Sequence, residues 1–199
     1  KFSYGTEAQK HKWLPKVALQ YDISYTSNMY VQWTKGFKSG GANLPGGGAE
    51  NLGPVTGPYD PEEIDAYETG LKSQLLDGAI TWNSAVFYYD YQDLQTTTNL
   101  PPAVTFVTNA DAKVYGLETE LWWQATDSLK LNAAATWLRS RFQDYTLYNN
   151  VTAVDVDLDN SPVPHSPDYT ANIGADYEIK HVVSYQSLIY TQEVKTDGF

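Results

Sequence analysis

Residues 60–95 read DPEEIDAYETGLKSQLLDGAITWNSAVFYYDYQDLQ, two alternating segments joined by a short turn at Leu76-Asp77-Gly78. From residue 79 onward, one set of alternate positions is mostly apolar and the other is polar, small or aromatic. The first set is Ile80, Trp82, Ser84, Val86 and Tyr88, and the second is Thr81, Asn83, Ala85, Phe87 and Tyr89. A period of two indicates a β-strand whose two faces meet different surroundings. What the apolar face contacts therefore decides the fold.

The composition is consistent with a soluble β protein or with a membrane β-barrel. No apolar run approaches the roughly 18 residues that a membrane helix needs, whereas barrel strands need only about 9–11 alternating residues. The 16 Tyr and 6 Trp in 199 residues favour the barrel, because these side chains form girdles at membrane interfaces. Soluble carbohydrate-binding β proteins are also rich in them.

Charge and cysteine content exclude several functions. The formal net charge of −11 argues against nucleic acid as a partner, because its phosphates would be repelled. Cysteine is absent, so neither disulfides nor thiolate metal sites can form. The three histidines, His11, His165 and His181, lack metal-ligand spacing. The sequence therefore predicts no cofactor and no metal site.

The alternation continues along most of the chain. It predicts strands over residues 13–24, 28–37, 64–73, 79–95, about 114–124, 129–137, 169–177 and 182–191. Glycine and proline predict a long loop at 38–59, and further loops are expected at 96–104 and 143–167. No strand pattern leads up to Phe199.

The local signals conflict at residues 60–63. Asp60 is a good helix cap, Pro61 suits the first helical position and Glu63 suits the third. We expect a single helical turn at 61–63, followed by a strand. A longer helix is the alternative here, because Ile64 and Leu71 belong to a set at near-helical spacing.

The order of the connections favours one fold. Short connections near 25–27, 74–78, 124–128 and 180 alternate with longer ones at 38–63, 96–104 and 143–167. Such alternation places all tight turns at one end of an up-and-down sheet, as in outer-membrane barrels. A sandwich with Greek-key crossovers has no reason to keep it. The predicted fold is all-β, an antiparallel up-and-down transmembrane β-barrel.

Five phrases, in order, support a family resemblance: KGFKSGG at 35–41, PEEIDAYETGLKS at 61–73, AVFYYDYQDLQ at 85–95, TNADAKVYGLETEL at 108–121 and SPDYTANIGADYE at 166–178. The sequence resembles the C-terminal barrel of TonB-dependent outer-membrane receptors of the iron-complex type. The resemblance implies that residues 1–199 form a partial barrel domain, about eight strands of a barrel of about 22. A plug domain and the last strands are then expected elsewhere in the full-length protein.

The resemblance also implies the function. Receptors of this kind take up a metal chelate such as a ferric siderophore across the outer membrane of a Gram-negative bacterium, without catalysis. The implied partners are outer-membrane lipid, the plug domain of the same protein, the TonB energising complex and the small-molecule chelate. The TonB complex would act through an N-terminal part that this chain lacks.

The same resemblance assigns the two strand faces and a few ligand contacts. The expected lipid-facing residues are Ile80, Trp82, Val86, Tyr88, Leu117, Leu121 and Trp123. The expected lumen-facing residues are Glu68, Lys72, Asn83, Glu118 and Glu120. Three loop tyrosines, Tyr59, Tyr145 and Tyr148, are candidate ligand contacts.

Two other functions remain open at this point. Glu118 and Glu120 could serve as the paired acids of a glycoside hydrolase, so a soluble all-β carbohydrate-binding or glycoside-hydrolysing domain is the first alternative. A passive porin is the second. Asp155, Asp157 and Asp159 imitate the start of a calcium loop, but Asn160 and Ser166 stand where that motif needs Gly and Glu.

Overall fold

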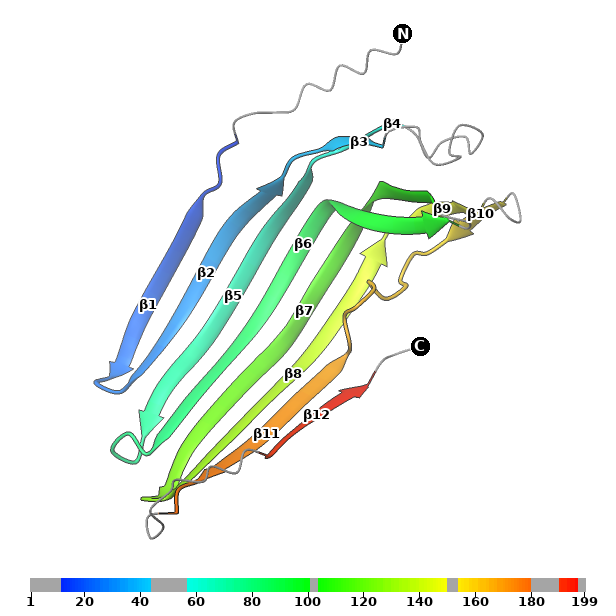
Figure 1. Cartoon of the computed structure of the whole chain (residues 1–199). Coiled ribbons are helices and arrows are strands. Elements are labelled where there is room, and N and C mark those ends of the chain that lie inside the picture. The colour runs from blue at the N-terminus through cyan, green and yellow to red at the C-terminus, as the bar shows by residue number, and fades with distance from the viewer. Residues whose placement is uncertain (1–11, 44–56, 101–103, 150–153, 180–189, 197–199) are drawn as a thin grey trace.

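A computed structural model describes residues 12–43, 57–100, 104–149, 154–179 and 190–196, with the side chains of 99, 100, 104, 148, 149 and 190–196 excluded. Eight strands form the main sheet (Figure 1). They are β1 (Lys16–Ser24), β2 (Ser27–Lys38), β5 (Glu62–Leu75), β6 (Ile80–Leu100), β7 (Val104–Thr126), β8 (Leu129–Gln143), β11 (Tyr169–Tyr177) and β12 (Tyr190–Thr196). Two small hairpins pair β3 (Gly41–Asn43) with β4 (Gly57–Tyr59), and β9 (Thr146–Asn149) with β10 (Val154–Asp157).

The main sheet is antiparallel throughout, and each strand pairs with the next main strand along the chain. The connections β1–β2, β5–β6 and β7–β8 lie at one end, the turn end, and the small hairpins lie at the other, the loop end (Figure 1). The β5–β6 turn uses left-handed backbone at Leu76, Asp77 and Gly78, with φ of 52°, 54° and 87°. The all-β, up-and-down prediction is confirmed.

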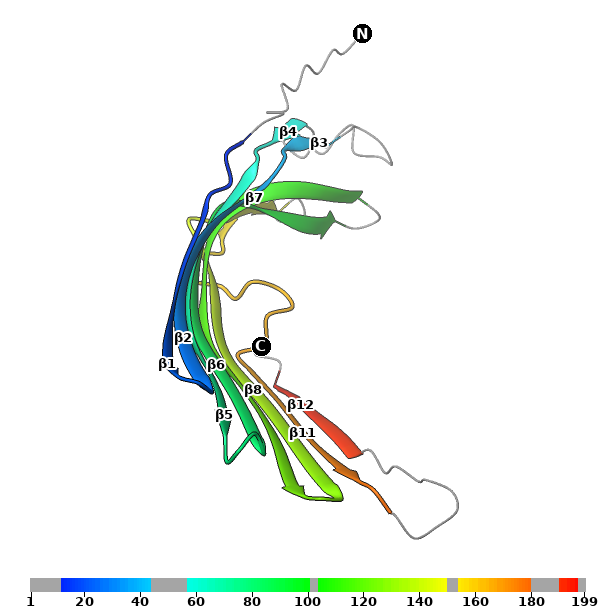
Figure 2. The same cartoon turned by 90° about the vertical axis from the view of Figure 1, so that its left-hand side faces the viewer.

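The sheet is curved, and the hairpins of the loop end fold over its concave side (Figure 2). Ala112 and Phe142 are buried there against Leu158 and Val163, which precede β11. Strand alternation then places Glu118, on the same side of β7 as Ala112, on the concave face. The opposite positions form the convex face, which is apolar and exposed along most of the sheet.

Two aromatic side chains on the concave face lie over glycines of the neighbouring strand. Phe87 is opposite Gly116 and is only 5 % exposed, and Tyr30 is opposite Gly70. A Cβ at Gly116 would collide with the Trp137 carbonyl oxygen, and a Cβ at Gly70 would meet the Tyr30 ring. Glycine at these positions therefore lets the rings lie flat against the sheet.

The structure corrects the local assignments at 60–63. Residues 62 and 63 are already in β5, so both the helical turn and the longer helix are wrong. Lys38 and Phe37 of β2 pair with Glu62 and Glu63, and these ladder bonds replace the helical ones. None of the described residues forms a helix that is long and apolar enough to cross a membrane.

The loop predictions are also partly wrong, because strands extend into them. Residues 96–100 continue β6 and residue 104 begins β7, so most of the expected loop at 96–104 belongs to paired strands. The loop at 38–59 contains β3 and β4, and the loop at 143–167 contains β9 and β10. The predicted strand at 182–191 falls mainly outside the described residues. A strand, β12, does precede Phe199, and it continues to residue 196.

Candidate functional site

The predicted lumen-facing residues gather on the concave face. The ladder places Glu68 opposite Phe87, Lys72 opposite Asn83, and Asn83 opposite Glu120. A hollow of about 330 Å³ is lined by all five predicted residues, Glu68, Lys72, Asn83, Glu118 and Glu120, together with Tyr30, Phe87 and Tyr89. The sequence thus identified residues from three strands that share one polar wall.

The carboxylates of this wall differ in their partners. Glu68 accepts hydrogen bonds at Oε1 from the Tyr30 hydroxyl, 2.6 Å away, and from Gln32 Nε2, 3.1 Å away. Glu118 and Glu120 are exposed and form no ion pair with any residue that the structure describes. Among the described residues, the wall therefore presents two carboxylates without an ion-pair partner to the concave space.

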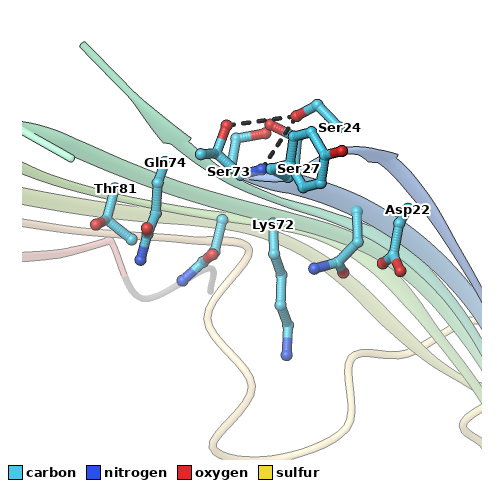
Figure 3. A pocket seen from close by; sticks show the side chains of 11 residues that line it. Asp22, Ser24, Ser27, Lys72, Ser73, Gln74 and Thr81 are labelled. Carbon is cyan, nitrogen blue, oxygen red and sulfur yellow. Dashed lines mark hydrogen bonds between the residues drawn. The ribbon is translucent and has the colours of Figure 1, made fainter. Parts of the chain in front are cut away.

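Lys72 belongs to a second hollow at the turn end. This hollow measures about 900 Å³ and is lined by Lys72, Asp22, Asn28, Gln74 and Asn83 among others. Lys72, Asp22, Gln74 and Thr81 extend from one side of the sheet, while Ser24, Ser27 and Ser73 lie on the other side (Figure 3). The Lys72 ammonium is 5.5 Å from the centre of the Tyr30 ring. The Lys72 side chain is thus directed into the concave space.

The predicted lipid-facing residues share the convex face. Ile80, Trp82, Val86 and Tyr88 pair in order with Trp123, Leu121, Leu117 and Tyr115. All seven predicted residues are exposed except Ile80, which is half-buried, and Val86 is 52 % exposed. A face of this kind in contact with water would be costly, which is why the nature of its surroundings matters.

Aromatic side chains form a row across the convex face towards the loop end, the aromatic row. Tyr67 and Tyr88 ring centres are 6.4 Å apart, Tyr88 and Tyr115 are 6.5 Å apart, and Tyr115 and Trp137 are 6.1 Å apart. Trp33 extends the row, since it pairs with Tyr67 on β5, and its Nε1 donates to Asp65 Oδ1 over 2.9 Å. An aromatic row with polar tips is typical of a membrane interface.

The three candidate ligand tyrosines have different positions. Tyr145 is 5 % exposed and packs on Phe142, and its hydroxyl is 3.0 Å from Thr108 Oγ1, so it offers little surface to a ligand. Tyr59 is half-buried in β4, with its hydroxyl beside Gly41. The side chain of Tyr148 lies outside the described residues. Tyr145 therefore has a structural role that its sequence position did not reveal.

Sequence reasoning missed the polar contacts that join the hairpins of the loop end. Asn43 Nδ2 donates to the Val107 carbonyl over 2.7 Å, and Asn43 Oδ1 accepts from the Val107 amide over 2.8 Å. Asn109 Nδ2 donates to the carbonyls of Asp60 (3.0 Å) and Asp93 (2.7 Å), and its Oδ1 accepts from the Asp60 amide (2.7 Å). The amides act as substitutes for backbone groups, a role for which the sequence carries no signal.

Asp93 lies where β6 bends. The ladder shifts register between Tyr91 and Leu94, and Asp93 adopts a φ of 54°. Its amide donates to Asp111 Oδ1 over 3.0 Å. Burial raises the pKa of the Asp93 carboxyl, and the nearby charges of Asp60 and Asp111 raise it further. This end of the sheet therefore contains a cluster of mutually repelling carboxylates.

The acidic segment at 155–159 uses its carboxylates within the chain. Asp157 Oδ1 accepts from the Asp159 amide over 2.8 Å, and Asp159 Oδ1 accepts from the Asp144 amide over 2.9 Å. Among the described residues, no group of three or more His, Asp or Glu side chains is arranged to hold a metal ion.

An antiparallel up-and-down sheet with an exposed apolar convex face and a polar concave face is typical of part of an outer-membrane β-barrel. A family model described as "TonB dependent receptor-like, beta-barrel" matches residues 1–198. The chain belongs to this family, whose members are outer-membrane proteins of Gram-negative bacteria. They are transporters, so the hydrolytic role considered for Glu118 and Glu120 does not apply.

This chain matches only part of the length of each individual relative. The metal-pseudopaline receptor CntO of Pseudomonas aeruginosa is 27 % identical over 124 residues, which are 62 % of this chain and 16 % of that protein. The ferric yersiniabactin uptake receptor FyuA from Yersinia pestis has a TM-score of 0.65 at 23 % identity, covering 92 % of this chain and 25 % of FyuA. The pyoverdine receptor FpvA of P. aeruginosa PAO1 has a TM-score of 0.54 at 19 % identity, covering 84 % of this chain and 22 % of FpvA. These structural likenesses concern the fold alone.

Proposed function

We propose that this chain is part of a TonB-energised receptor that carries a metal chelate, such as a ferric siderophore, across the outer membrane. The match of residues 1–198 to the receptor barrel family carries the proposal. The curated relative CntO is named for a metal chelate, which supports the ligand class. The chain spans about a sixth of that relative, so ligand, plug domain and TonB complex all belong to the proposal.

The two faces of the sheet have different partners in this proposal. The convex face, with Val86, Leu117 and Leu121 at its centre, contacts outer-membrane lipid. The concave face lines the lumen, and its unpaired Glu118 and Glu120 meet a plug domain of the same protein. The support is electrostatic, because carboxylates that form no ion pair on their own wall favour a partner that supplies donors.

The test of this function is uptake by cells that express the complete gene. We expect a plug domain to be encoded upstream and about three further strands downstream. A deletion strain should lose accumulation of a radiolabelled ferric siderophore or of another metal chelate, and an uncoupler of the proton gradient should abolish uptake. Uptake that persists with the uncoupler would favour a passive porin instead.

The wall carboxylates provide a residue-level version of this test. Glu118→Gln together with Glu120→Gln should weaken plug seating and increase passive entry of a bulky hydrophilic antibiotic. Asp155→Asn together with Asp157→Asn removes two charges from an exposed loop-end hairpin, and it should leave entry unchanged. Equal entry in both double variants would contradict the assignment of the wall to the plug.

A further inference from the structure

Beyond the bend at Asp93, β6 and β7 continue as a hairpin that folds over the concave side of the sheet (Figure 2). We call its two paired arms, residues 94–100 and 104–110, the lid. Pairing is continuous within the lid and again below the bend, but Gln92 and Asp93 together face Asp111 alone. A bulge of this kind bends a strand. The lid is therefore a paired unit that joins the sheet at an irregular position, the hinge.

Polar contacts fasten the lid to the segments beside it. The Asn43 amide bonds to both the carbonyl and the amide of Val107. Asn109 bonds to the backbone of Asp60, and Gln95 Nε2 donates to the Asp60 carbonyl over 3.2 Å at an exposed position. Such bonds contribute little net free energy each, because water can replace either partner. They can hold the lid closed and still permit it to open.

Two opposing forces act on the closed lid. Apolar burial favours closure, since Phe106 of the lid is only 5 % exposed. Repulsion opposes closure at the hinge, where the Asp93 amide donates to Asp111 Oδ1 over 3.0 Å. The backbone carbonyls of Asp60 and Asp93 share one donor, the side-chain amide of Asn109. Closing the lid therefore brings three aspartates together at the hinge.

The cations on the strands around the hinge have other carboxylates beside them. Lys38 of β2 has Glu62 of β5 at 3.8 Å, Arg141 of β8 has Asp168 at 3.5 Å, and Lys113 of β7 has Asp90 of β6 directly opposite. Within the described part of the chain, no cation forms an ion pair with Asp60, Asp93 or Asp111. The negative charge of the three aspartates therefore has no direct partner.

The charge state of Asp93 depends on the position of the lid. Burial raises the pKa of its carboxyl, and the charges of Asp60 and Asp111 raise that pKa further. A carboxyl with a raised pKa in the closed position binds its proton more tightly there than in an open, solvated position. Protonation therefore favours the closed lid, and this contribution is lost as the pH rises through the raised pKa.

We propose that the lid is a pH-sensitive gate between the cell surface and the concave wall, hinged at Gln92 and Asp93, which closes in acid and opens towards neutral pH. The cargo gives this direction a chemical reason. Protons compete with a metal ion for the donor atoms of its ligands, so intact chelates become scarce in acid. The gate then opens under the conditions in which the cargo exists. The inference rests on the proposed receptor function, with the loop end at the cell surface.

The experiment labels a cysteine on the concave wall from outside intact cells that express the full-length receptor. Ala66→Cys places the thiol one step from Glu68 towards the loop end, and fluorescein maleimide is the probe, so no chelate is needed. Asp155→Cys, at an exposed position of β10, is labelled in a parallel strain and corrects for the pH dependence of the thiol reaction itself. We expect the ratio of the two labelling rates to fall as the pH is lowered from neutrality to about 5.

Three further substitutions, each combined with Ala66→Cys, assign the effect to the hinge. Asp93→Asn should lower the ratio at least about twofold at neutral pH and remove its dependence on pH. Asp144→Asn is the matched control, because Asp144 has the same left-handed backbone outside the cluster, and it should keep the native profile. Asn43→Ala removes both bonds to Val107 and should raise the ratio at every pH.

Any of three results would overturn the inference. The first is a labelling ratio that does not change with pH, and the second is the same shift in Asp144→Asn as in Asp93→Asn. The third is a wall cysteine that stays unlabelled in Asn43→Ala at neutral pH, since an opened lid must expose the wall. A heat-modifiable gel shift verifies that each variant is folded. Failure of the proposed function is distinct, because it appears as a receptor whose lid responds to pH but which takes up no chelate.

Discussion

At the scale of single residues, alternate positions on one strand face different surroundings. Val86 is on the convex face and 52 % exposed, whereas Asn83 lines the concave wall. A membrane strand tolerates a charge where water is present and resists it where lipid is present. Substitutions at these two positions therefore separate the two faces.

We predict that Val86→Arg blocks membrane assembly, with a cost of roughly 2–4 kcal/mol if this position is near the bilayer midplane. Asn83→Arg should be far milder, since its side chain extends into the polar hollow. The fraction of folded protein in the outer membrane measures both effects. Equal losses at the two positions would refute the assignment of the faces.

Gly116 gives a second prediction at this scale. A Cβ there would collide with the Trp137 carbonyl, a backbone atom, and would displace the Phe87 ring. Gly116→Ala should destabilise the sheet by about 1–3 kcal/mol, measured as a lower midpoint of urea unfolding in detergent. Gly174→Ala is the control, because the added methyl would meet the Asn132 side-chain amide, which can rotate away.

At the scale of elements, β6 and β7 continue as a hairpin beyond the bend at Asp93. The Asn43 contacts hold this hairpin against β3, and the Asn109 contacts hold it against Asp60, which follows β4. Beneath it, Ala110, Ala112, Phe142 and Tyr145 form a small buried core. The hairpins of the loop end are therefore connected by specific bonds and not only by the strands that lead into them.

We predict that Asn109→Ala loosens this layer while the sheet below stays intact. The substitution removes an acceptor for the Asp60 amide and a donor to two carbonyls, at about 1–3 kcal/mol. Hydrogen exchange should accelerate within residues 94–110 and stay unchanged in β5. Thr97→Ala, at an exposed position of the same hairpin, serves as the control. Faster exchange throughout the sheet would contradict a local role.

The carboxylate cluster predicts a pH dependence of the same layer. Because burial, Asp60 and Asp111 raise the pKa of Asp93, its charged form opposes folding at neutral pH. Protection from exchange in residues 94–110 should increase as the pH falls from neutrality towards the ordinary range of an aspartate. Asp93→Asn should increase protection at neutral pH, and its advantage over the native protein should disappear in acid.

A matched control exists for this substitution. Asp144 also has a left-handed φ, 51°, and its amide also donates to an aspartate, Asp159. Asparagine tolerates this backbone conformation, so neither substitution introduces strain. Asp144→Asn lies outside the Asp60–Asp93–Asp111 cluster and should leave the pH profile of residues 94–110 unchanged. If it produced the same shift, the cluster would not be the cause.

How far the sequence predicts these elements depends on the residues involved. Alternation alone identified β1, β2, β6 and β8, because each has one apolar and one mixed face. It failed at Glu62 and Glu63, where a good helix start is overridden by pairing with β2. It also failed at residues 96–99, a polar run with no apolar face, where pairing with β7 is what makes the segment a strand.

The candidate site was also predictable from the sequence only in part. Strand period and order place one set of residues on the same face, and these residues line one hollow, although their contact with a lumen stays a prediction: Glu68, Lys72, Asn83, Glu118 and Glu120. The burial of Tyr145 and the Asn43–Val107 contacts were not predictable, since both depend on how hairpins fold back over the sheet. Contacts perpendicular to the sheet leave no periodic trace in a single sequence.

At the scale of the whole molecule, the apolar convex face extends over the main sheet from β1 to β11. Val17, Leu19 and Ile173 on the outer strands of that range are all more than half exposed. We predict that the full-length protein requires detergent for extraction and that its gel mobility changes on boiling, as expected of a membrane β-sheet. Release by a salt or alkaline wash without detergent would contradict the contact with lipid.

The continuous ladder from Leu94 to Ala110 restricts how this protein can change in length during evolution. A single inserted residue in one arm of the β6–β7 hairpin would exchange its two faces beyond that point, and would misplace Phe106 and the partners of Asn43. A balanced insertion of one residue in each arm keeps the pairing, and two residues in each arm also return Phe106 to its own face. Related receptors should therefore differ in this hairpin by even numbers of residues, while connections without a ladder accept any number.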